Sequence, residues 1–358
     1  MYNISTKHLL FLLLLMILSI IFTALINGIF LKFSKTLGTR DNTVIRWATE
    51  TKPSVGGFGF YIMFLCSIIF FTIFVDPESI FKNIKFVGIV IAISLGFIMG
   101  LADDAYNTKP LLKLGVQILC AIILYLTGTQ VQTFNVEYLN FVLTILWVVG
   151  IMNSINLLDN MDGITGSISV IITSFLILTI ILFHNTLSID LIILVSILGA
   201  LIGFLIYNWH PSKLFMGDTG SQFLGVYLAA FGITYIWNQE DVMGNSIVSK
   251  QILNVALVFI IPLIDTTTVF INRIIRGQSP FIGGRDHTTH NLSYLGLSDK
   301  NVAIIMVAIT LLSSILAIIV NNMKEWTSLK SIPFFAFWVI VFVTLFTITR
   351  RHEYKFKK

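Results

Sequence analysis

The chain contains 358 residues, of which 56% are hydrophobic and 11% are charged, with 23 Lys and Arg against 18 Asp and Glu. Soluble domains carry roughly twice that charged fraction, so the composition excludes a soluble enzyme, a disordered chain and a disulfide scaffold. The runs 9–30, 252–264 and 332–346 contain no charged residue. The composition therefore predicts an all-α, polytopic helical membrane protein.

Eleven apolar segments follow one another along the chain, and a bilayer core needs about 20 apolar residues per helix. In chain order they cover residues 8–31, 55–75, 86–101, 114–128, 137–152, 164–184, 189–207, 220–237, 251–271, 301–320 and 332–349. Barrel strands would alternate in polarity, and these segments do not. The sequence therefore predicts about eleven transmembrane helices in a single domain over residues 1–358.

The loops between these segments differ in their basic residues. Seventeen of the 23 Lys and Arg fall on one side, in loops 32–54, 102–113, 208–219 and 272–300 and in the tail from residue 350. Cytoplasmic loops of membrane proteins carry such an excess. The N-terminus is therefore predicted outside and the C-terminus in the cytoplasm. Because the excess follows membrane-flanking loops, the net charge of +5 does not indicate nucleic acid as a partner.

Polar clusters gather on this predicted cytoplasmic side. Asp103 and Asp104 close the third segment, whereas Asp265 lies deeper in the ninth. Adjacent carboxylates stay ionised only near a cation, or one of them takes up a proton and can act as a general acid or base. A solvated helix end is the alternative interpretation of this pair.

A second cluster follows the fifth segment. Asn153, Asn156, Asp159 and Asp162 are three residues apart and therefore lie on one side of a helical turn. Such an oxygen-rich set suits a hard divalent cation and its phosphate ligands. An Asn-rich turn between two spans is the alternative.

A third cluster precedes the eighth segment. Gly217 and Gly220 permit close backbone approach, and Asp218 is placed to cap the helix that follows. A helix N-terminus facing the cytoplasm is also a natural phosphate site. Phe215 at the loop tip suits stacking on a base, or simple packing.

A fourth cluster lies in the long loop after the ninth segment. It contains Arg285, His287 and His290, preceded by Arg273 and Arg276. Zinc would need a further His or Cys ligand that the loop lacks. Guanidinium groups grip phosphate in a bidentate fashion, which favours phosphate recognition. Contact between the first two arginines and anionic lipid headgroups is the alternative.

Taken together and in this order, the four clusters resemble those of the polyprenyl-phosphate N-acetylhexosamine-1-phosphate transferases, which include undecaprenyl-phosphate N-acetylglucosaminyl 1-phosphate transferases, in glycosyltransferase family 4. The resemblance runs from about residue 52 to residue 292 and includes Thr-Lys-Pro-Ser-Val-Gly-Gly at 51–57 and Ser-Pro-Phe at 279–281. It implies an eleven-span layout with an outside N-terminus. It also implies that sugar 1-phosphate moves from a UDP-sugar donor to a polyprenyl phosphate acceptor, with release of UMP.

The resemblance assigns roles to the matching positions. It implies Mg²⁺ as the cofactor, with Mn²⁺ as a substitute, at Asn156 and Asp218, and a metal would neutralise charge on the transferred phosphoryl group. It places Asp103 and Asp104 near the attacking lipid phosphate, as base or orienting groups. The uridine end is assigned to Lys52, Asp162 and Phe215, and the diphosphate or sugar to Arg285, His287 and His290. Asn153 and Asp159 complete the expected substrate-binding set.

The last loop bears on the branch of the family. The branch that transfers phospho-N-acetylmuramoyl-pentapeptide in peptidoglycan synthesis tends to carry consecutive histidines there, whereas residues 287–290 read His-Thr-Thr-His. The sequence is closer to the branch that primes O-antigen, teichoic acid or other envelope glycans with N-acetylglucosamine 1-phosphate (GlcNAc-1-phosphate).

These features predict a multi-pass protein of the bacterial cytoplasmic (inner) membrane with its active site facing the cytoplasm, and they are compatible with a homodimer. Three alternatives stay open: the pentapeptide transferase, a transporter of anionic solutes, and a non-catalytic membrane interaction protein.

Overall fold

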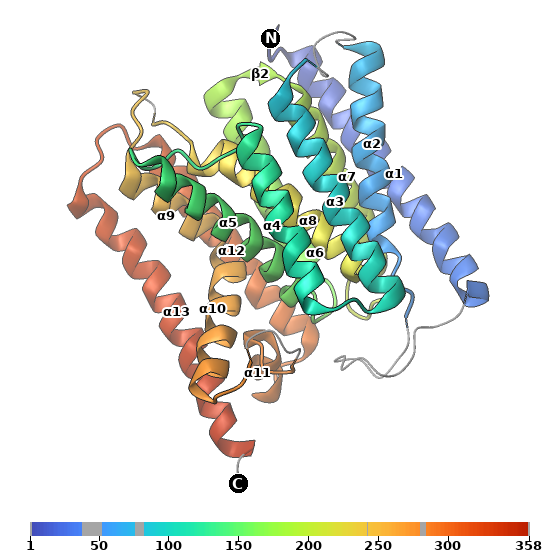
Figure 1. Ribbon diagram of the computed structural model, residues 1–358, viewed down its shortest axis with the longest axis vertical. Coiled ribbons are helices and arrows are strands. Elements are labelled where there is room, and N and C mark those ends of the chain that lie inside the picture. Colours follow the sequence, from blue (N-terminus) through green and yellow to red (C-terminus); the bar gives the residue numbers. More distant parts are fainter. Residues whose placement is uncertain (1, 38–51, 76–81, 242, 280–283, 357–358) are drawn as a thin grey trace.

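The computed structural model describes the chain except for residues 1, 38–51, 76–81, 242, 280–283 and 357–358 (Figure 1). The α-helices are α1 (Thr6–Leu37), α2 (Gly56–Phe74), α3 (Ile84–Tyr106), α4 (Pro110–Leu126), α5 (Glu137–Leu158), α6 (Ile164–Thr179), α7 (Ile189–Asn208), α8 (Gly217–Gly232), α9 (Val248–Val258), α10 (Ile260–Ile275), α11 (Thr288–Tyr294), α12 (Asp299–Asn322) and α13 (Ser328–Phe356). Two π-helical turns extend α6 and α8, namely η1 (Ile180–His184) and η2 (Ile233–Trp237). The strands β1 (Tyr2–Asn3) and β2 (Thr186–Leu187) pair antiparallel. The helical fold class is confirmed.

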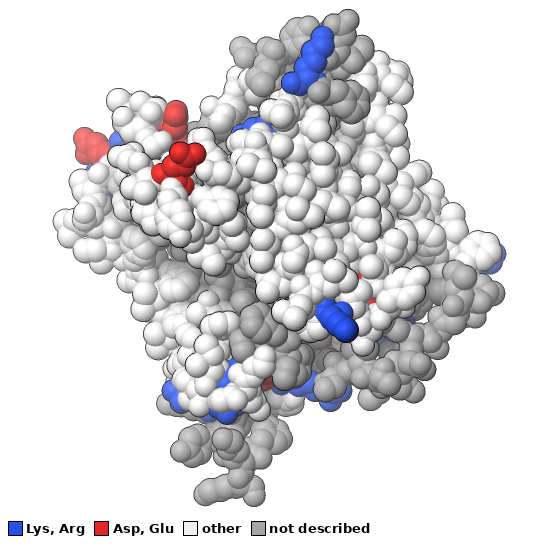
Figure 2. All heavy atoms as spheres, viewed as in Figure 1, with Lys and Arg blue, Asp and Glu red and all other residues white. Residues whose placement is uncertain are grey.

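The helices have the length and polarity of membrane spans. Among the described residues, eight are long and apolar enough to cross a bilayer, or nine if α9 and α10 form one span bent by 82°. Every predicted segment coincides with a helix or a helix pair, but α4 has only 17 residues and α8 begins with polar side chains. Figure 2 shows charged side chains at the two ends of the molecule with an uncharged band between them. The count of eleven and the orientation stay predictions.

The bend between α9 and α10 has a local cause. Pro262 lacks a backbone N–H and cannot donate to the carbonyl of residue 258, so the helical ladder breaks there. The Oγ of Ser154 in α5 donates a hydrogen bond to the carbonyl of Pro262 at 2.5 Å. The bend directs α10 toward the end of the bundle that carries the polar clusters, the lower end in Figure 1.

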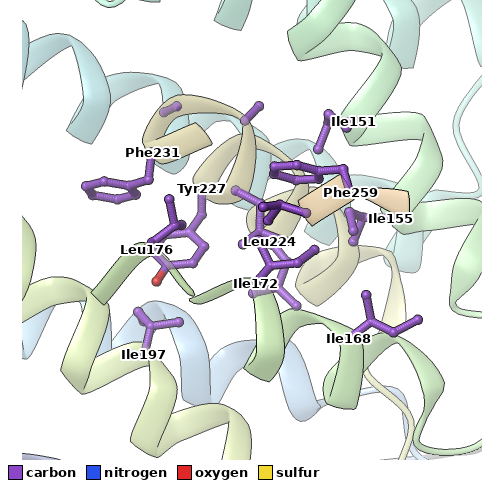
Figure 3. Packing of buried hydrophobic residues seen from close by; sticks show 14 of the residues in the cluster. Ile151, Ile155, Ile168, Ile172, Leu176, Ile197, Leu224, Tyr227, Phe231 and Phe259 are labelled. Atoms are coloured by element: carbon purple, nitrogen blue, oxygen red, sulfur yellow. The ribbon is translucent and has the colours of Figure 1, made fainter. Parts of the chain in front are cut away.

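Helix α8 lies at the centre of the bundle. It packs against α2, α3, α5 and α6, and nearly all of its residues are buried. Figure 3 shows Leu224, Tyr227 and Phe231 of α8 among isoleucine and leucine side chains of α5, α6 and α7. Because protein rather than lipid surrounds α8, the helix does not need to be uniformly apolar, and its first turn can carry polar groups.

Glycines bring the first turn of α8 against its neighbours. A Cβ on Gly100 of α3 would lie 2.2 Å from the backbone oxygen of Asp218, and a Cβ on Gly57 of α2 would lie 2.3 Å from the backbone nitrogen of Gly220. Real Cβ atoms essentially never approach this closely. Backbone contact between helices therefore fixes where α8 begins relative to the end of α3.

Candidate active site

The two adjacent carboxylates at the end of α3 have different partners. Asp103 Oδ1 accepts hydrogen bonds from the backbone N–H and the hydroxyl of Thr108, at 2.9 and 2.7 Å. Asp104 Oδ2 accepts from the backbone N–H and the hydroxyl of Thr219, at 2.8 and 2.7 Å. Asp104 thus satisfies a free N–H in the first turn of α8, which is a capping contact from another helix.

A lysine that the sequence analysis did not single out lies at the middle of this cluster. The Nζ of Lys113, at the start of α4, is 2.9 Å from Asp103 Oδ2 and 3.6 Å from Asp218 Oδ1. It also donates a hydrogen bond to Asn156 Oδ1 at 3.2 Å. Oxygens from α3, α5 and α8 therefore surround one cationic group.

The predicted metal positions are in direct contact. Asn156 Nδ2 donates to Asp218 Oδ1 at 2.5 Å and to Ser221 Oγ at 2.8 Å. One turn earlier, Asn153 Nδ2 donates to Gln117 Oε1 at 2.8 Å, and the amide of Gln117 in turn donates to Gln222 Oε1 at 3.1 Å. In the part of the chain that the structure describes, no group of three or more His, Cys, Asp or Glu side chains could hold a metal. The groups that the structure brings together here are carboxylates and amides.

The three residues assigned to the uridine end also come together. The Nζ of Lys52 lies 5.5 Å from the ring centroid of Phe215 and donates to Ser212 Oγ at 3.4 Å. The carboxylate of Asp162 accepts hydrogen bonds from the backbone N–H and the hydroxyl of Ser212, at 2.9 and 2.7 Å. His210 Nδ1 lies 3.4 Å from the same carboxylate. His210 and Ser212 belong to this group, and the sequence analysis did not identify them.

A short backbone bridge holds the segment before α2 against the start of α8. Ser54 and Phe215 form a parallel bridge. The N–H of Phe215 donates to the carbonyl of Pro53 at 2.9 Å, and the N–H of Gly56 donates to the carbonyl of Phe215 at 3.1 Å. Phe215 and Asp218 are only three residues apart, so the bridge places the Lys52 group beside the Asp103 group.

In the loop between α10 and α11, which carries the fourth polar cluster, Asp286 contacts two arginines. Arg273 donates from Nε and Nη2 to the two carboxylate oxygens at 2.9 and 2.7 Å, and Arg276 lies 3.7 Å away. Burial would raise the pKa of Asp286, but the hydrogen bonds and charge of Arg273 outweigh it and hold that pKa below its usual value. Arg273 is 2% exposed, so the lipid-headgroup interpretation is wrong for this residue.

The two histidines of the last loop differ. His287 Nδ1 lies 2.8 Å from Asp265 Oδ2, whereas His290 lies beside it, with ring centroids 5.5 Å apart. Burial, and then the proximity of His287, lower the pKa of His290 to about 4. His290 is therefore neutral at pH 7 and could contact a substrate only as an uncharged hydrogen-bonding group.

A side-chain contact joins the loop between α10 and α11 to the turn after α5. Thr289 Oγ1 donates to Asn160 Oδ1, in the turn after α5, at 2.8 Å. Asp159 is the C-cap residue of α5 in that turn. Arg285 is exposed in the loop between α10 and α11. All twelve predicted site residues thus lie at one end of the bundle. The motif residues Thr51, Pro280 and Phe281 lie outside the described residues.

Comparison with known proteins identifies the family of the chain. Residues 86–236 match the model of glycosyl transferase family 4. A phospho-N-acetylmuramoyl-pentapeptide-transferase of Streptococcus uberis is 35% identical over 250 residues, covering 61% of this chain and 71% of that protein. The chain belongs to glycosyl transferase family 4.

Two further relatives of the chain are informative. A probable undecaprenyl-phosphate N-acetylglucosaminyl 1-phosphate transferase of Bacillus subtilis is 29% identical over 315 residues, covering 85% of this chain and 82% of that protein. A decaprenyl-phosphate N-acetylglucosaminephosphotransferase of Mycobacterium leprae is 28% identical over 236 residues, covering 58% of each chain. The resemblance drawn from the motifs is confirmed, and so is the prediction of a membrane transferase. The transporter and the non-catalytic protein are therefore set aside.

Proposed function

We propose that this glycosyl transferase moves N-acetylhexosamine 1-phosphate, with GlcNAc-1-phosphate as the expected group, from a UDP-sugar to polyprenyl phosphate and releases UMP. One observation carries the proposal. Carboxylate and amide oxygens of α3, α5 and α8 surround the ammonium of Lys113 at a membrane end of the bundle. Transfer of a phosphoryl group between two anionic substrates needs such a concentration of positioned charge.

The donor set at this point fits Mg²⁺. Carboxylate and amide oxygens are ligands that hard divalent cations prefer, and the oxygens of Asp103, Asn156 and Asp218 already surround a cationic group within 3.6 Å. Asn156 and Asp218 would hold the metal, with Mn²⁺ as a substitute. When bound, the metal would neutralise charge on the transferred phosphoryl group.

The neighbouring residues of the chain have separate tasks in the proposed reaction. Lys113 supplies a fixed positive charge beside the reacting phosphates. Asp103 faces that lysine and is placed to act on the acceptor phosphate as base or orienting group. Asp104 holds the first turn of α8 through Thr219, so its contribution is to orient the helix that carries Asp218.

The UDP-sugar donor would contact two further groups of residues, one around Phe215 and one in the loop between α10 and α11. Phe215, with Lys52 and Asp162 beside it, would receive the uridine, and Arg285 and His287 would bind the diphosphate or sugar. Asn153 and Asp159 line the same end of α5. His290 is uncharged at neutral pH, and we assign it a hydrogen bond to the sugar or its phosphate.

The choice of sugar rests on the last loop. Thr288 and Thr289 stand where the pentapeptide branch tends to carry histidines, and both are hydrogen-bonded, to Asp265 and to Asn160. The 29% identity to the N-acetylglucosaminyl transferase also covers more of this chain than the match to the pentapeptide transferase does. Pentapeptide transfer is the second candidate because that match has the higher identity, 35%.

The proposed setting follows from the topology prediction. The chain would form a single integral domain of the bacterial cytoplasmic membrane, with the site facing the cytoplasm, where UDP-sugars are made. A homodimer stays a prediction.

The proposal is tested with purified protein, UDP-sugar and polyprenyl phosphate in detergent. One phosphoanhydride is broken and one of the same kind is made, so the equilibrium constant should be near unity and the reaction should run backwards with UMP. We expect UMP release, and exchange of labelled UMP into UDP-N-acetylglucosamine only when the lipid phosphate or its sugar diphosphate product is present. Exchange without lipid would indicate a covalent enzyme intermediate.

The two donors decide the branch. At matched concentration we expect UDP-N-acetylglucosamine to be used far better than UDP-N-acetylmuramoyl-pentapeptide, and the reverse result would assign the chain to the pentapeptide branch. Asp241, a partly buried carboxylate in the loop between η2 and α9, offers a control away from the site. The Asp241→Asn variant should release UMP at the rate of the unaltered protein, whereas absence of UMP release with either donor would refute the proposed reaction.

A further inference from the structure

A buried carboxylate in α10 has no assigned role in the proposed reaction. Asp265 is 1% exposed and follows the bend at Pro262 by three residues. An ionised group in a membrane-spanning segment is costly unless it is paired, and such groups usually serve function. Among the described residues, His287 is the basic side chain that lies in contact with Asp265, with Nδ1 and Oδ2 2.8 Å apart.

The partners of Asp265 show which atoms donate. The backbone N–H of Thr288 donates to Oδ1 at 2.8 Å, and its hydroxyl donates to the same oxygen at 2.6 Å. Two donors to one oxygen are what an ionised carboxylate accepts, because in that state it has no proton to give. The ring nitrogen that meets Oδ2 must then be a donor, so the hydrogen sits on Nδ1 of His287.

The contact also fixes where His287 points. The imidazole is 3% exposed, and its Nδ1 is bound toward the bundle. Two contacts hold the ring in this orientation, because the Asp265 carboxylate binds both the ring of His287 and the backbone N–H of Thr288. With Nδ1 directed inward, Nε2 is the ring nitrogen left to meet a substrate.

We propose that Asp265 is a positioning residue that holds His287 with its Nδ1–H on the carboxylate and presents Nε2 to the diphosphate of the sugar donor. The assignment of the diphosphate rests on the proposed function, whereas the Asp265–His287 contact does not. Thr288 and Thr289 help to hold His287 in place. Thr288 binds Asp265 and Thr289 binds Asn160, so the segment that carries His287 is attached to α10 and to the turn after α5.

The Asp265→Asn variant tests this directly. An Asn side chain can keep Oδ1 as the acceptor for Thr288, but its Nδ2 presents hydrogens to His287, which must then accept at Nδ1. Removing the carboxylate behind a metal-binding imidazole costs about 10- to 100-fold in other proteins, and we expect a loss of that order in kcat/KM for the UDP-sugar. The matched control is Asp190→Asn, because Asp190 of α7 accepts from Tyr235 OH at 2.6 Å and, among the described residues, lies at the end of α7 opposite to Asn208, which contacts the loop before α8.

A double variant separates positioning from a structural role. If Asp265 acts through His287, then Asp265→Asn should add no further loss to a His287→Gln protein. Losses that multiply in the double variant would overturn the proposal, as would an Asp265→Asn protein with unchanged kcat/KM. Asp190→Asn should stay within about twofold of the unaltered protein.

A spectroscopic measurement covers the case in which a variant fails to fold, and it does not depend on the reaction. With ¹⁵N-labelled histidine in the unaltered protein, the ring nitrogens of His287 should show Nδ1 protonated and hydrogen-bonded. A His287 ring with an unprotonated Nδ1 would overturn the proposal. If the protein released no UMP but Nδ1 were protonated, the contact would stand while the proposed function, and with it the assigned ligand, would fail.

Discussion

Replacing Gly100 by alanine should separate the two helices on which the site is built. Gly100 precedes Asp103 and Asp104 by about one turn of α3. Its added Cβ would lie 2.2 Å from the backbone oxygen of Asp218 and 2.6 Å from the backbone carbon of Asp218 and from Cα of Thr219. All three atoms belong to the backbone of α8, so no side-chain rotation can relieve the contact.

The displacement can be worked out from these distances. Ordinary van der Waals contact begins at 3.4 Å, so the contact must open by roughly 1.2 Å, the difference between 3.4 and 2.2 Å. The same movement would stretch the 2.8 Å bond from the N–H of Thr219 to Asp104 to about 4 Å, beyond hydrogen-bonding distance. Overpacking typically costs about 1–3 kcal/mol of stability, and a misplacement near 1 Å costs about 100-fold in rate.

The Gly150→Ala variant is the matched control. Gly150 lies in α5, two turns before Asn156, and a Cβ there would meet nothing within 4 Å. Both variants would be purified in detergent and compared for UMP release and thermal unfolding. We expect Gly100→Ala to lose about 100-fold in turnover while Gly150→Ala keeps it. Equal turnover in the two variants would refute the view that backbone contact between α3 and α8 aligns the site.

Three further predictions concern the metal, the orientation and acid stability. Asp218→Asn should abolish UMP release without unfolding the protein, and EDTA should inactivate the unaltered enzyme until Mg²⁺ or Mn²⁺ is added; full turnover in excess chelator would contradict the metal assignment. In a variant without the two native cysteines, a cysteine at position Lys213 should be protected from an impermeant thiol reagent in intact cells and one at Asn83 should be labelled, and the reverse pattern would invert the topology. Because the pKa of His290 falls from 6.5 to about 4 on folding, the unfolded chain binds the extra proton between these values, so stability present above pH 6.5 is lost as the pH falls toward 4. The loss is roughly 3 kcal/mol at 1.36 kcal/mol per unit, and the melting temperature of His290→Gln should fall less steeply over this range; equal slopes would contradict it.

The helices and the grouping of the polar side chains at one end of the bundle could be predicted because both leave local marks in the sequence. Apolar runs of span length predict helices, and a carboxylate such as Asp103 or Asp218 at the end of such a run is conspicuous. Each predicted span coincides with a helix or a helix pair. The count of eleven stays a prediction, because α8 is enclosed by protein and α9 and α10 are bent by 82°, so neither follows the simple rule of one straight apolar helix per crossing.

Lys113 shows why the centre of the site could not be predicted. A single lysine one turn into a short apolar helix looks like an interfacial anchor of the kind that many membrane helices carry. Its importance depends on Asn156 and Asp218, which lie 43 and 105 residues further along the chain. No local pattern encodes such a contact. The same holds for Ser212, an ordinary loop serine by sequence, which joins Lys52 to Asp162.

The fold gives the adjacent carboxylates Asp103 and Asp104 separate partners, which the sequence alone does not reveal. Two adjacent carboxylates repel one another, and both lie near the membrane, where unpaired charge is costly. The structure separates them by direction: Asp103 meets the ammonium of Lys113, and Asp104 meets the first turn of α8, whose N–H groups and dipole favour an anion. Because both partners are carried by helices rather than by flexible loops, the charges that the proposed reaction needs are held in place before any substrate binds.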